Sequence, residues 1–442
     1  MTALAARPTA RVRRHARPGL LALLVLAVVY GALVLLAATP GSRLVPATAG
    51  GSPDWLLGPL RPLGLSAGSR SPAGPLFYAG LWLALLAYAV VIARAHEIPR
   101  AAAVTALAGL HLLFALAPPL LSQDAFSYLA YARLGAVHGL DPYLAAPASV
   151  PADAVFAFAG SKEASSVYGP PFTLATYALA EVSVPVGLWV LKATAAAASL
   201  GAVVLVWRAA ARRGLDPRAA ALVVGLNPAL LVHVVGGAHN EALILLLTAS
   251  ALRAHARGRE ARGATLATAA AAVKASAALL VPFLIAGARR HRRAGAALAA
   301  VAVALGALLI GLGGFGAEAV GWLDAVRENQ ARTSSFSLPY KTAELLGALL
   351  PGERLDFRGP VRLVYAAAFA AVAGWLLVRT WRGADPVAMA GWATLALLVC
   401  SAWLVPWYVA WLVPLAALGR SRPLVTATLA LTAWTLAIAI PW

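Results

Sequence analysis

Long apolar segments separated by short polar connections recur along the whole chain. Several of them reach the roughly 17–25 residues that cross a bilayer as a helix. The pattern predicts an all-α polytopic membrane protein, with a basic cytoplasmic N-terminus at 1–19 and one integral membrane domain at 20–442. The predicted apolar segments are 20–39, 75–93, 101–121, 184–207, 219–235, 241–252, 264–288, 294–314, 361–378, 386–404, 407–418 and 424–440.

Two of these stretches are predicted to enter the membrane and turn back. Segment 264–288 is flanked by arginines on both sides, which argues against a single crossing, and Lys274 and Pro282 interrupt it. Residues 219–252 form a second predicted hairpin with its outer turn at 236–240. The count is then about 13 transmembrane or half-transmembrane helices, with the N-terminus inside and the C-terminus outside. If 264–288 crossed only once, everything after it would invert.

Composition and charge narrow the class of protein. Of the 442 residues 61% are hydrophobic and only 12% are charged, with a mean hydropathy of +0.78. A soluble domain is about one quarter charged, so soluble and disordered proteins are excluded. The net charge of +19 gathers in alternate connections, which marks their side as cytoplasmic in a cell-membrane protein. The basic pI of 11.1 therefore reports topology, and no nucleic-acid partner is expected.

The longest polar stretches are predicted to face the outer side, at 40–74, 122–171 and 315–360. The second of them opens directly after an apolar helix, and residues 124–138 are expected to form an interfacial helix. Asp124 would lie in the first turn of this helix, where the helix dipole favours a carboxylate. Taken alone, Asp124 fits an N-terminal helix acid or cap at least as well.

Ionisable residues in the apolar segments form a second group of candidates. An ionised lysine inside an apolar run costs about 2.5–3.5 kcal/mol, so Lys274 needs a partner or a function. It could reach a lipid phosphate, and the alternative is snorkelling to the interface, which is the preferred interpretation for Lys192. At the other turn, His239, Asn240 and Glu241 either cap the returning helix or border a pocket. Three consecutive residues do not make a zinc site.

Several short motifs follow one another in the order found in one family. They are Ser122-Gln123-Asp124-Ala125-Phe126-Ser127-Tyr128-Leu129-Ala130, Gly139-Leu140-Asp141-Pro142-Tyr143, Tyr168-Gly169-Pro170, Gly236-Gly237-Ala238-His239-Asn240-Glu241-Ala242-Leu243, Ala272-Val273-Lys274 and Pro406-Trp407-Tyr408. Together they resemble the actinobacterial polyprenol-phosphomannose-dependent α-1,6-mannosyltransferases, GT-C glycosyltransferases that extend the mannan of lipomannan. The resemblance departs at Phe126 and Glu241, where tyrosine and aspartate are usual.

The resemblance implies a GT-C-like helical bundle that moves mannose from polyprenyl-phosphate-mannose to a mannan or lipoglycan acceptor. The transfer would be inverting, would form an α-1,6 linkage at the extracytoplasmic face, and would use Asp124 as the general base. The donor phosphate and sugar would meet Lys274, His239, Asn240, Tyr168, Arg332 and Tyr340. The acceptor or the rim of the site would involve Tyr128, Asp141, Tyr143, Glu241, Trp407 and Tyr408. No metal and no cofactor besides the lipid-linked donor are expected.

Structural roles stay open for several of these residues, and a different activity stays open for the protein. The segments 141–143 and 168–170 are also typical of rigid turns, and Trp407 and Tyr408 of an interfacial aromatic belt. Arg332 fits ordinary surface charge as well. A related GT-C transferase could use another polyprenyl-phosphate sugar, such as a pentose. A transporter or lipid flippase would instead place ionisable residues along mid-membrane helices and show two related halves, whereas here the polar residues cluster in outer loops and hairpin turns.

Overall fold

The computed structural model describes residues 17–46, 48, 51–64, 73–335, 337–349 and 357–438. Residues 1–16 of the predicted basic N-terminus lie outside this part. So do portions of the predicted stretches 40–74 and 315–360 and the end of 424–440. Within the described residues every multi-residue element is a helix, which confirms the predicted all-α class.

The α-helices are α1 (Arg17–Ala37), α2 (Asp54–Leu57), α3 (Ala73–Ala93), α4 (Arg100–Leu116), α5 (Asp124–Ala136), α6 (Pro170–Thr176), α7 (Val184–Arg212), α8 (Pro217–Gly225), α9 (Glu241–Ala256), α10 (Glu260–Val273), α11 (Leu280–Ala286), α12 (Arg293–Phe315), α13 (Trp322–Ala331), α14 (Leu338–Leu349), α15 (Arg358–Trp381), α16 (Pro386–Cys400), α17 (Val409–Leu418) and α18 (Arg422–Ile438). The short helices are η1 (Gly58–Leu63), η2 (Ala95–Glu97), η3 (Pro147–Ser149), η4 (Tyr177–Leu179), the π-helix η5 (Leu230–Val235), η6 (Ala275–Leu279), η7 (Arg290–Arg292), η8 (Gly316–Val320) and η9 (Pro406–Tyr408).

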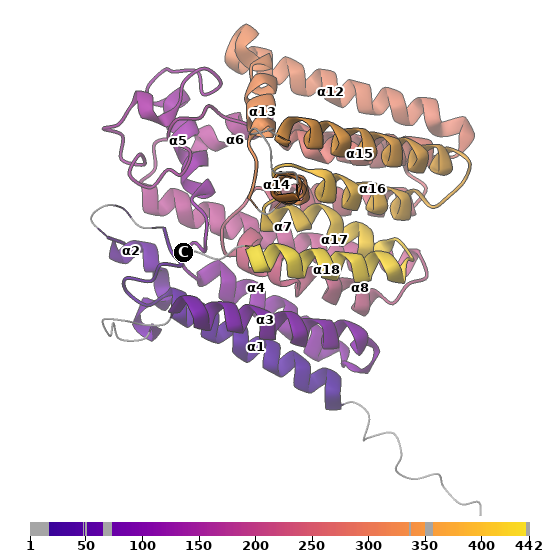
Figure 1. Ribbon diagram of the computed structural model, residues 1–442, viewed down its shortest axis with the longest axis horizontal. Coiled ribbons are helices and arrows are strands. Elements are labelled where there is room, and N and C mark those ends of the chain that lie inside the picture. The colour runs from indigo at the N-terminus through magenta and orange to yellow at the C-terminus, as the bar shows by residue number, and fades with distance from the viewer. Residues whose placement is uncertain are drawn as a thin grey trace, which may run out of the picture.

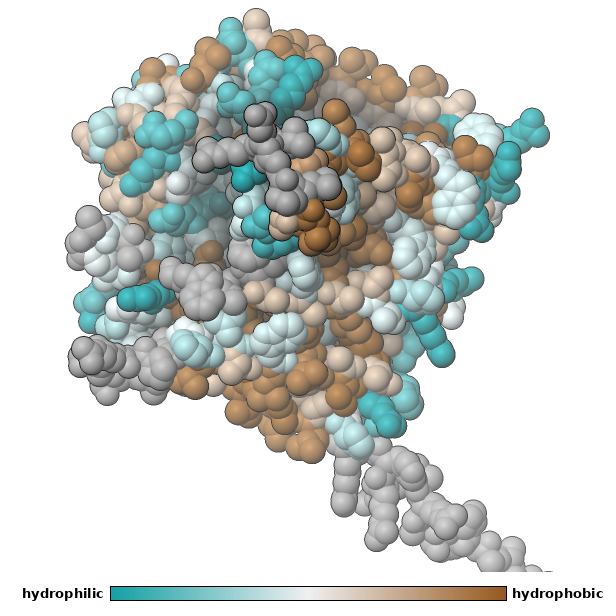
Figure 2. All heavy atoms as spheres, viewed as in Figure 1, coloured by the Kyte–Doolittle hydropathy of each residue, from teal (hydrophilic) through white to brown (hydrophobic). Residues whose placement is uncertain are grey.

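Five helical segments of the described chain are long and apolar enough to cross a membrane: Pro18–Ala37, Gly74–Ala93, Val184–Arg212, Arg290–Val320 and Arg358–Trp381. Helices α15 to α18 pack in succession, and α18 meets the α1–α3 pair (Figure 1). Apolar side chains cover the outer face of α1 and α3, as Figure 2 shows, where a bilayer would lie. The protein is therefore a helical membrane protein, and the count of about 13 crossings stays a prediction.

The segment 264–288 does turn back on itself. Its first arm is α10, its second arm is α11, and the chain between them is extended at Lys274 before η6. The two ends meet, because the carboxylate of Glu260 lies 3.0 Å from Arg292 and 3.9 Å from Arg289. The predicted hairpin is confirmed. The chain turns at Lys274, however, and Pro282 does not interrupt the helix that follows. Pro282 lies in the first turn of α11, where a proline is tolerated.

The loop at 122–171 folds against the end of the bundle that holds α5 and α6, opposite the connection between α15 and α16 (Figure 1). Helix α5 ends at Ala136, two residues earlier than predicted, and most of its residues are buried. The loop itself covers the helix: Phe158 stacks on Phe126 at 5.1 Å, and the Tyr131 hydroxyl donates to the Ala164 carbonyl. The loop therefore holds α5 rigidly, and its interfacial position stays a prediction.

Gly169, at the start of α6, joins this loop to the hairpin. Its N–H donates to the carbonyl of Val273 at 3.0 Å, beside the extended residue Lys274. A Cβ on Gly169 would overlap the carbonyl oxygen of Ala272, and a backbone atom cannot move aside as a flexible side chain does. Glycine is required at this position because the backbone of the hairpin comes too close to leave room for a side chain.

We predict that Gly169→Ala destabilises the protein by about 1–3 kcal/mol, the usual cost of forcing extra volume into a packed contact. The measurement is thermal unfolding of the purified protein. The matched control is Gly306→Ala in α12, where an added Cβ meets nothing within 4 Å. That control should be neutral or slightly stabilising, because alanine has the higher helix propensity. Equal melting temperatures for both variants would contradict the prediction.

Candidate active site

Asp124 is held at the N-terminus of α5. The preceding helix α4 ends at Leu116, and two prolines at 118–119 prevent it from continuing. The Asp124 N–H donates to the hydroxyl of Ser122 at 3.1 Å, and its carboxylate occupies the first turn of α5. The side chain is 28% exposed, so Asp124 can reach a ligand while the helix dipole stabilises its charge.

His239 connects Asp124 to the turn that precedes α9. Its Nδ1 lies 3.2 Å from Oδ2 of Asp124 and 3.7 Å from Oε2 of Glu241, and its side chain is fully buried. The imidazole stacks on the indole of Trp407, with ring centroids 4.0 Å apart and 26° between the planes. Because packing fixes the ring, the nitrogen facing Asp124 can hold that carboxylate in one orientation when it carries a proton.

Glu241 forms a buried ion pair with Lys274. The two side chains lie 2.5 Å apart, with Glu241 fully buried and Lys274 13% exposed. The ammonium group also lies near the faces of Tyr408 at 5.1 Å, Tyr168 at 5.7 Å and Trp411 at 5.9 Å. The side chains thus form a continuous chain in which acidic and basic groups alternate. We call it the charge chain, and it consists of Asp124, His239, Glu241 and Lys274.

The charge chain sets the ionisation of Asp124. Burial raises the pKa of this carboxyl, but His239 and Lys274 more than offset burial and hold the pKa below its ordinary value of 3.8. Asp124 is therefore ionised at neutral pH and can accept a proton.

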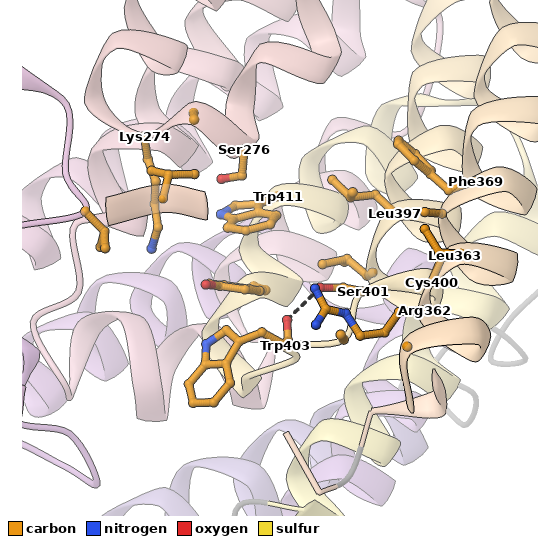
Figure 3. Close-up of a pocket in the computed structure, with 18 residues that line it drawn as sticks. Lys274, Ser276, Arg362, Leu363, Phe369, Leu397, Cys400, Ser401, Trp403 and Trp411 are labelled. Carbon is orange, nitrogen blue, oxygen red and sulfur yellow. Dashed lines mark hydrogen bonds between the residues drawn. The ribbon is translucent and has the colours of Figure 1, made fainter. Parts of the chain in front are cut away.

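Two adjoining cavities lie in front of the charge chain. A small cavity of about 100 Å³ is lined by Asp124, Ser127, Tyr131, Tyr168, Lys274, Glu328, Arg332, Trp403, Trp407 and Tyr408, among others. A larger cavity of about 650 Å³ is mainly apolar and shares Val167, Lys274, Trp403 and Tyr408 with the small one. Lys274 lies at one end of the large cavity, and the guanidinium of Arg362 points into it from the other side (Figure 3).

The structure thus places six of the predicted site residues around one cavity: Asp124, Tyr168, Lys274, Arg332, Trp407 and Tyr408. His239 and Glu241 lie directly behind them. Asn240 is buried beside them. Its side-chain amide has no hydrogen-bond partner among the described residues, while its N–H donates to the Tyr128 hydroxyl at 3.2 Å. Tyr128 packs edge-on against Tyr168 and supports that residue from behind.

Three other predicted residues lie apart from the cavities. The Asp141 carboxylate accepts from the N–H of Tyr143, which is the predicted turn, and the Tyr143 hydroxyl donates to the carbonyl of Tyr168 at 2.9 Å. Tyr143 therefore shapes the loop behind Tyr168. Tyr340 lies on α14, where Arg358 covers its ring at 5.3 Å, and it lines neither cavity.

Some lining residues were not among the predicted site residues. Arg362 lies within a predicted apolar segment, so the rule that singled out Lys274 could have found it. Trp403 and Glu328 carried no signal, because an interfacial tryptophan and a loop acid are common in membrane proteins. Within the described residues no three His, Cys, Asp or Glu side chains are grouped to hold a metal ion, and the metal-free expectation stays a prediction.

A buried chain of ionisable groups beside a polar cavity, within a helical membrane protein, is typical of an enzyme site. Residues 24–290 match the family described as alpha-(1→6)-mannopyranosyltransferase, N-terminal domain, and residues 345–442 match the MptB C-terminal domain. Both regions contribute to the two cavities, the first with Asp124 and Lys274, the second with Arg362 and Tyr408.

Individual relatives agree with this match. The chain is 30% identical over 352 residues to alpha-(1→6)-mannopyranosyltransferase A of Mycobacterium tuberculosis, covering 74% of this chain and 67% of the relative. It is 33% identical over 153 residues to a probable alpha-(1→6)-mannopyranosyltransferase of Mycolicibacterium smegmatis (33% and 27% covered). It is 29% identical over 178 residues to alpha-(1→6)-mannopyranosyltransferase A of Corynebacterium glutamicum (38% and 35% covered). The chain belongs to the alpha-(1→6)-mannopyranosyltransferase family and is a mannosyltransferase.

We predict that Glu241→Gln destabilises the protein by about 3–5 kcal/mol, because it leaves the buried Lys274 without its counter-ion. Combining it with Lys274→Met should recover most of this loss, since an apolar pair of similar volume is tolerated. The measurement is thermal unfolding. The control is Glu344→Gln, which removes an exposed partner of Lys341 and should cost under about 1 kcal/mol. A double variant no more stable than Glu241→Gln alone would contradict the prediction.

Proposed function

We propose that the protein transfers mannose from polyprenyl-phosphate-mannose to a mannan or lipoglycan acceptor, with inversion, at the extracytoplasmic face. The observation that carries this proposal is that Asp124 and Lys274 line the same polar cavity, which adjoins the 650 Å³ apolar cavity. A lipid-linked sugar needs this combination: a polar site for the sugar and phosphate, and an apolar site of ligand size for the isoprenoid chain.

Asp124 acts as the general base in this reaction. The acceptor hydroxyl attacks the anomeric carbon of mannose, its proton passes to the Asp124 carboxylate, and the bond from that carbon to the phosphate oxygen breaks. Nδ1 of His239 lies 3.2 Å from Oδ2 of Asp124, so we assign Oδ1 as the oxygen that accepts the proton. Attack opposite the leaving phosphate inverts the anomeric carbon, so a β-linked donor gives an α-linked product, and the family relationship supports an α-1,6 linkage.

Lys274 and Arg362 provide the positive charge for the departing polyprenyl phosphate. Phosphate gains negative charge as the glycosidic bond breaks, and fixed cations in a site of low dielectric stabilise that charge strongly. Lys274 belongs to both cavities and Arg362 lines the apolar one, so the phosphate would lie where the two cavities meet. Glu241 holds one N–H of Lys274, and the remaining two are left for phosphate oxygens.

The extracytoplasmic orientation rests on charge. The basic connections, such as those at 208–218, 253–263 and 379–385, follow the positive-inside rule, and the loop that carries Asp124 belongs to the opposite set. Figure 1 agrees with this arrangement, because α5 and the connection between α15 and α16 lie at opposite ends of the bundle.

The direct test of this proposal is incorporation of labelled mannose from polyprenyl-phosphate-mannose into a mannoside acceptor by the purified protein. We predict that Asp124→Asn lowers kcat by about 10²–10⁴-fold, the contribution of a positioned general base, and leaves donor binding intact. The control is Glu163→Gln, which also replaces a carboxylate by an amide, at an exposed position in the same loop, and it should leave kcat unchanged. Near-normal transfer by Asp124→Asn would refute the role of Asp124 as the general base. Transfer from a pentose donor alone would show that the transferred sugar is not mannose.

We also predict that His239→Phe moves the acidic limb of the kcat–pH profile to higher pH. The sign follows from the pKa of Asp124, which His239 helps to hold below 3.8. The base works only when ionised, so a raised pKa means that activity is lost earlier as the pH falls. Phenylalanine keeps the stacking on Trp407. The control, His138→Phe, removes a partner of Asp153 in the outer loop and should leave the limb in place.

A further inference from the structure

Lys192 is a fully buried lysine that the proposed reaction does not use. It lies on α7, and its side chain is 0% exposed, so the predicted snorkelling to the interface is wrong. Its ammonium group donates instead to three backbone carbonyls: Gly236 at 2.8 Å, Phe114 at 3.1 Å and Pro118 at 3.5 Å. All three of its N–H groups therefore have acceptors, as a buried polar group requires.

The carbonyl of Phe114 shows what this lysine replaces. In a continuing helix it would accept from the N–H four residues later, but that residue is Pro118, which has no N–H. The N–H of Ala117 is already taken by Leu113. Lys192 thus supplies the donor that the proline cannot, at the C-terminal end of α4, where the helix dipole also favours a positive charge.

The carbonyls bound by Lys192 belong to the two segments that carry the charge chain. Phe114 and Pro118 lie on the segment that leads to Asp124, and Gly236 opens the turn that leads to His239. The carbonyl of Gly236 also accepts from the N–H of Leu120 at 3.1 Å, so both segments meet at this one oxygen. Removing the ammonium group would leave the bond from Leu120 as the remaining link at this oxygen and would take the shared donor away from the carbonyls of Phe114 and Pro118.

We propose that Lys192 is a positioning residue, which fixes the segment carrying Asp124 against the turn carrying His239 and so keeps the two side chains in contact. The inference rests on the proposed function of Asp124 as the general base. Misplacing a base by about 1 Å can cost on the order of 10²-fold in rate, so a tether at this point controls turnover without touching the substrate.

The test compares Lys192→Met, which keeps an unbranched side chain of nearly the same length and removes its donors, with Ser199→Ala as the matched control. Ser199 lies two turns along the same helix and makes a 3.0 Å hydrogen bond with His111. This bond also links α7 to α4, but it involves neither the prolines after α4 nor the turn at 236–240. Lys192→Met should lower kcat by about 10–100-fold with the KM for the donor within about twofold of wild type. Ser199→Ala should lower the melting temperature alone.

A second measurement shows whether Lys192 acts through Asp124. In an Asp124→Asn background, Lys192→Met should lower the residual rate by less than about threefold, because residues that act as a unit are not additive. A full additional loss would overturn the inference. If Asp124→Asn itself retains transfer, the proposed base is wrong. If that variant is inactive and Lys192→Met alone has a normal kcat, only the positioning role is wrong.

The inference also stays testable if Lys192→Met does not fold. Lys192→Gln keeps one neutral donor group, and its kcat should fall between wild type and the 10–100-fold loss expected for Lys192→Met. If neither variant yields folded protein while Ser199→Ala does, Lys192 holds the bundle as a whole, and the specific positioning role is overturned.

Discussion

The ion pair between Glu241 and Lys274 is the interaction on which the site depends. Each partner lies where a hairpin turns: Glu241 begins α9, and Lys274 is the extended residue between α10 and η6. Neither charge could remain in an apolar interior alone, and at 2.5 Å each compensates the other. The pair therefore fastens the two hairpins together, and His239, which lies 3.7 Å from the second oxygen of Glu241, connects the pair to Asp124.

Re-entrant segments allow a membrane bundle to expose such groups. A continuous helix satisfies its own backbone and offers only side chains, whereas a turn inside the protein must find partners for its free N–H and carbonyl groups. The hydroxyl of Tyr128 meets the N–H of Asn240, and Lys192 meets the carbonyl of Gly236. The polar groups that hold these turns also fix the positions of the side chains beside them.

The separate parts of this site could be predicted from the sequence, but the contacts between those parts could not. Flanking arginines indicated the hairpin at 264–288, and the cost of an apolar lysine singled out Lys274. Nothing local indicated that Glu241, expected at the rim, pairs with Lys274, because this contact joins two hairpins across 33 residues. The predicted snorkelling of Lys192 is wrong for a similar reason: its acceptors exist because a proline and a glycine turn, far away in the chain, leave carbonyls facing it.

In the proposed reaction, with Asp124 as the general base, the balance of charges in the site indicates how the barrier would be lowered. Asp124 has a depressed pKa, so it is a weak base, and a weak base removes a proton only when the attacking hydroxyl has already become acidic. That condition is met late, when the anomeric carbon carries much positive charge and the bond to phosphate is largely broken. Stabilising the leaving group must then supply most of the catalysis. In the proposed reaction, this stabilisation would come from the positive groups that line the two cavities: Lys274, Arg332 and Arg362.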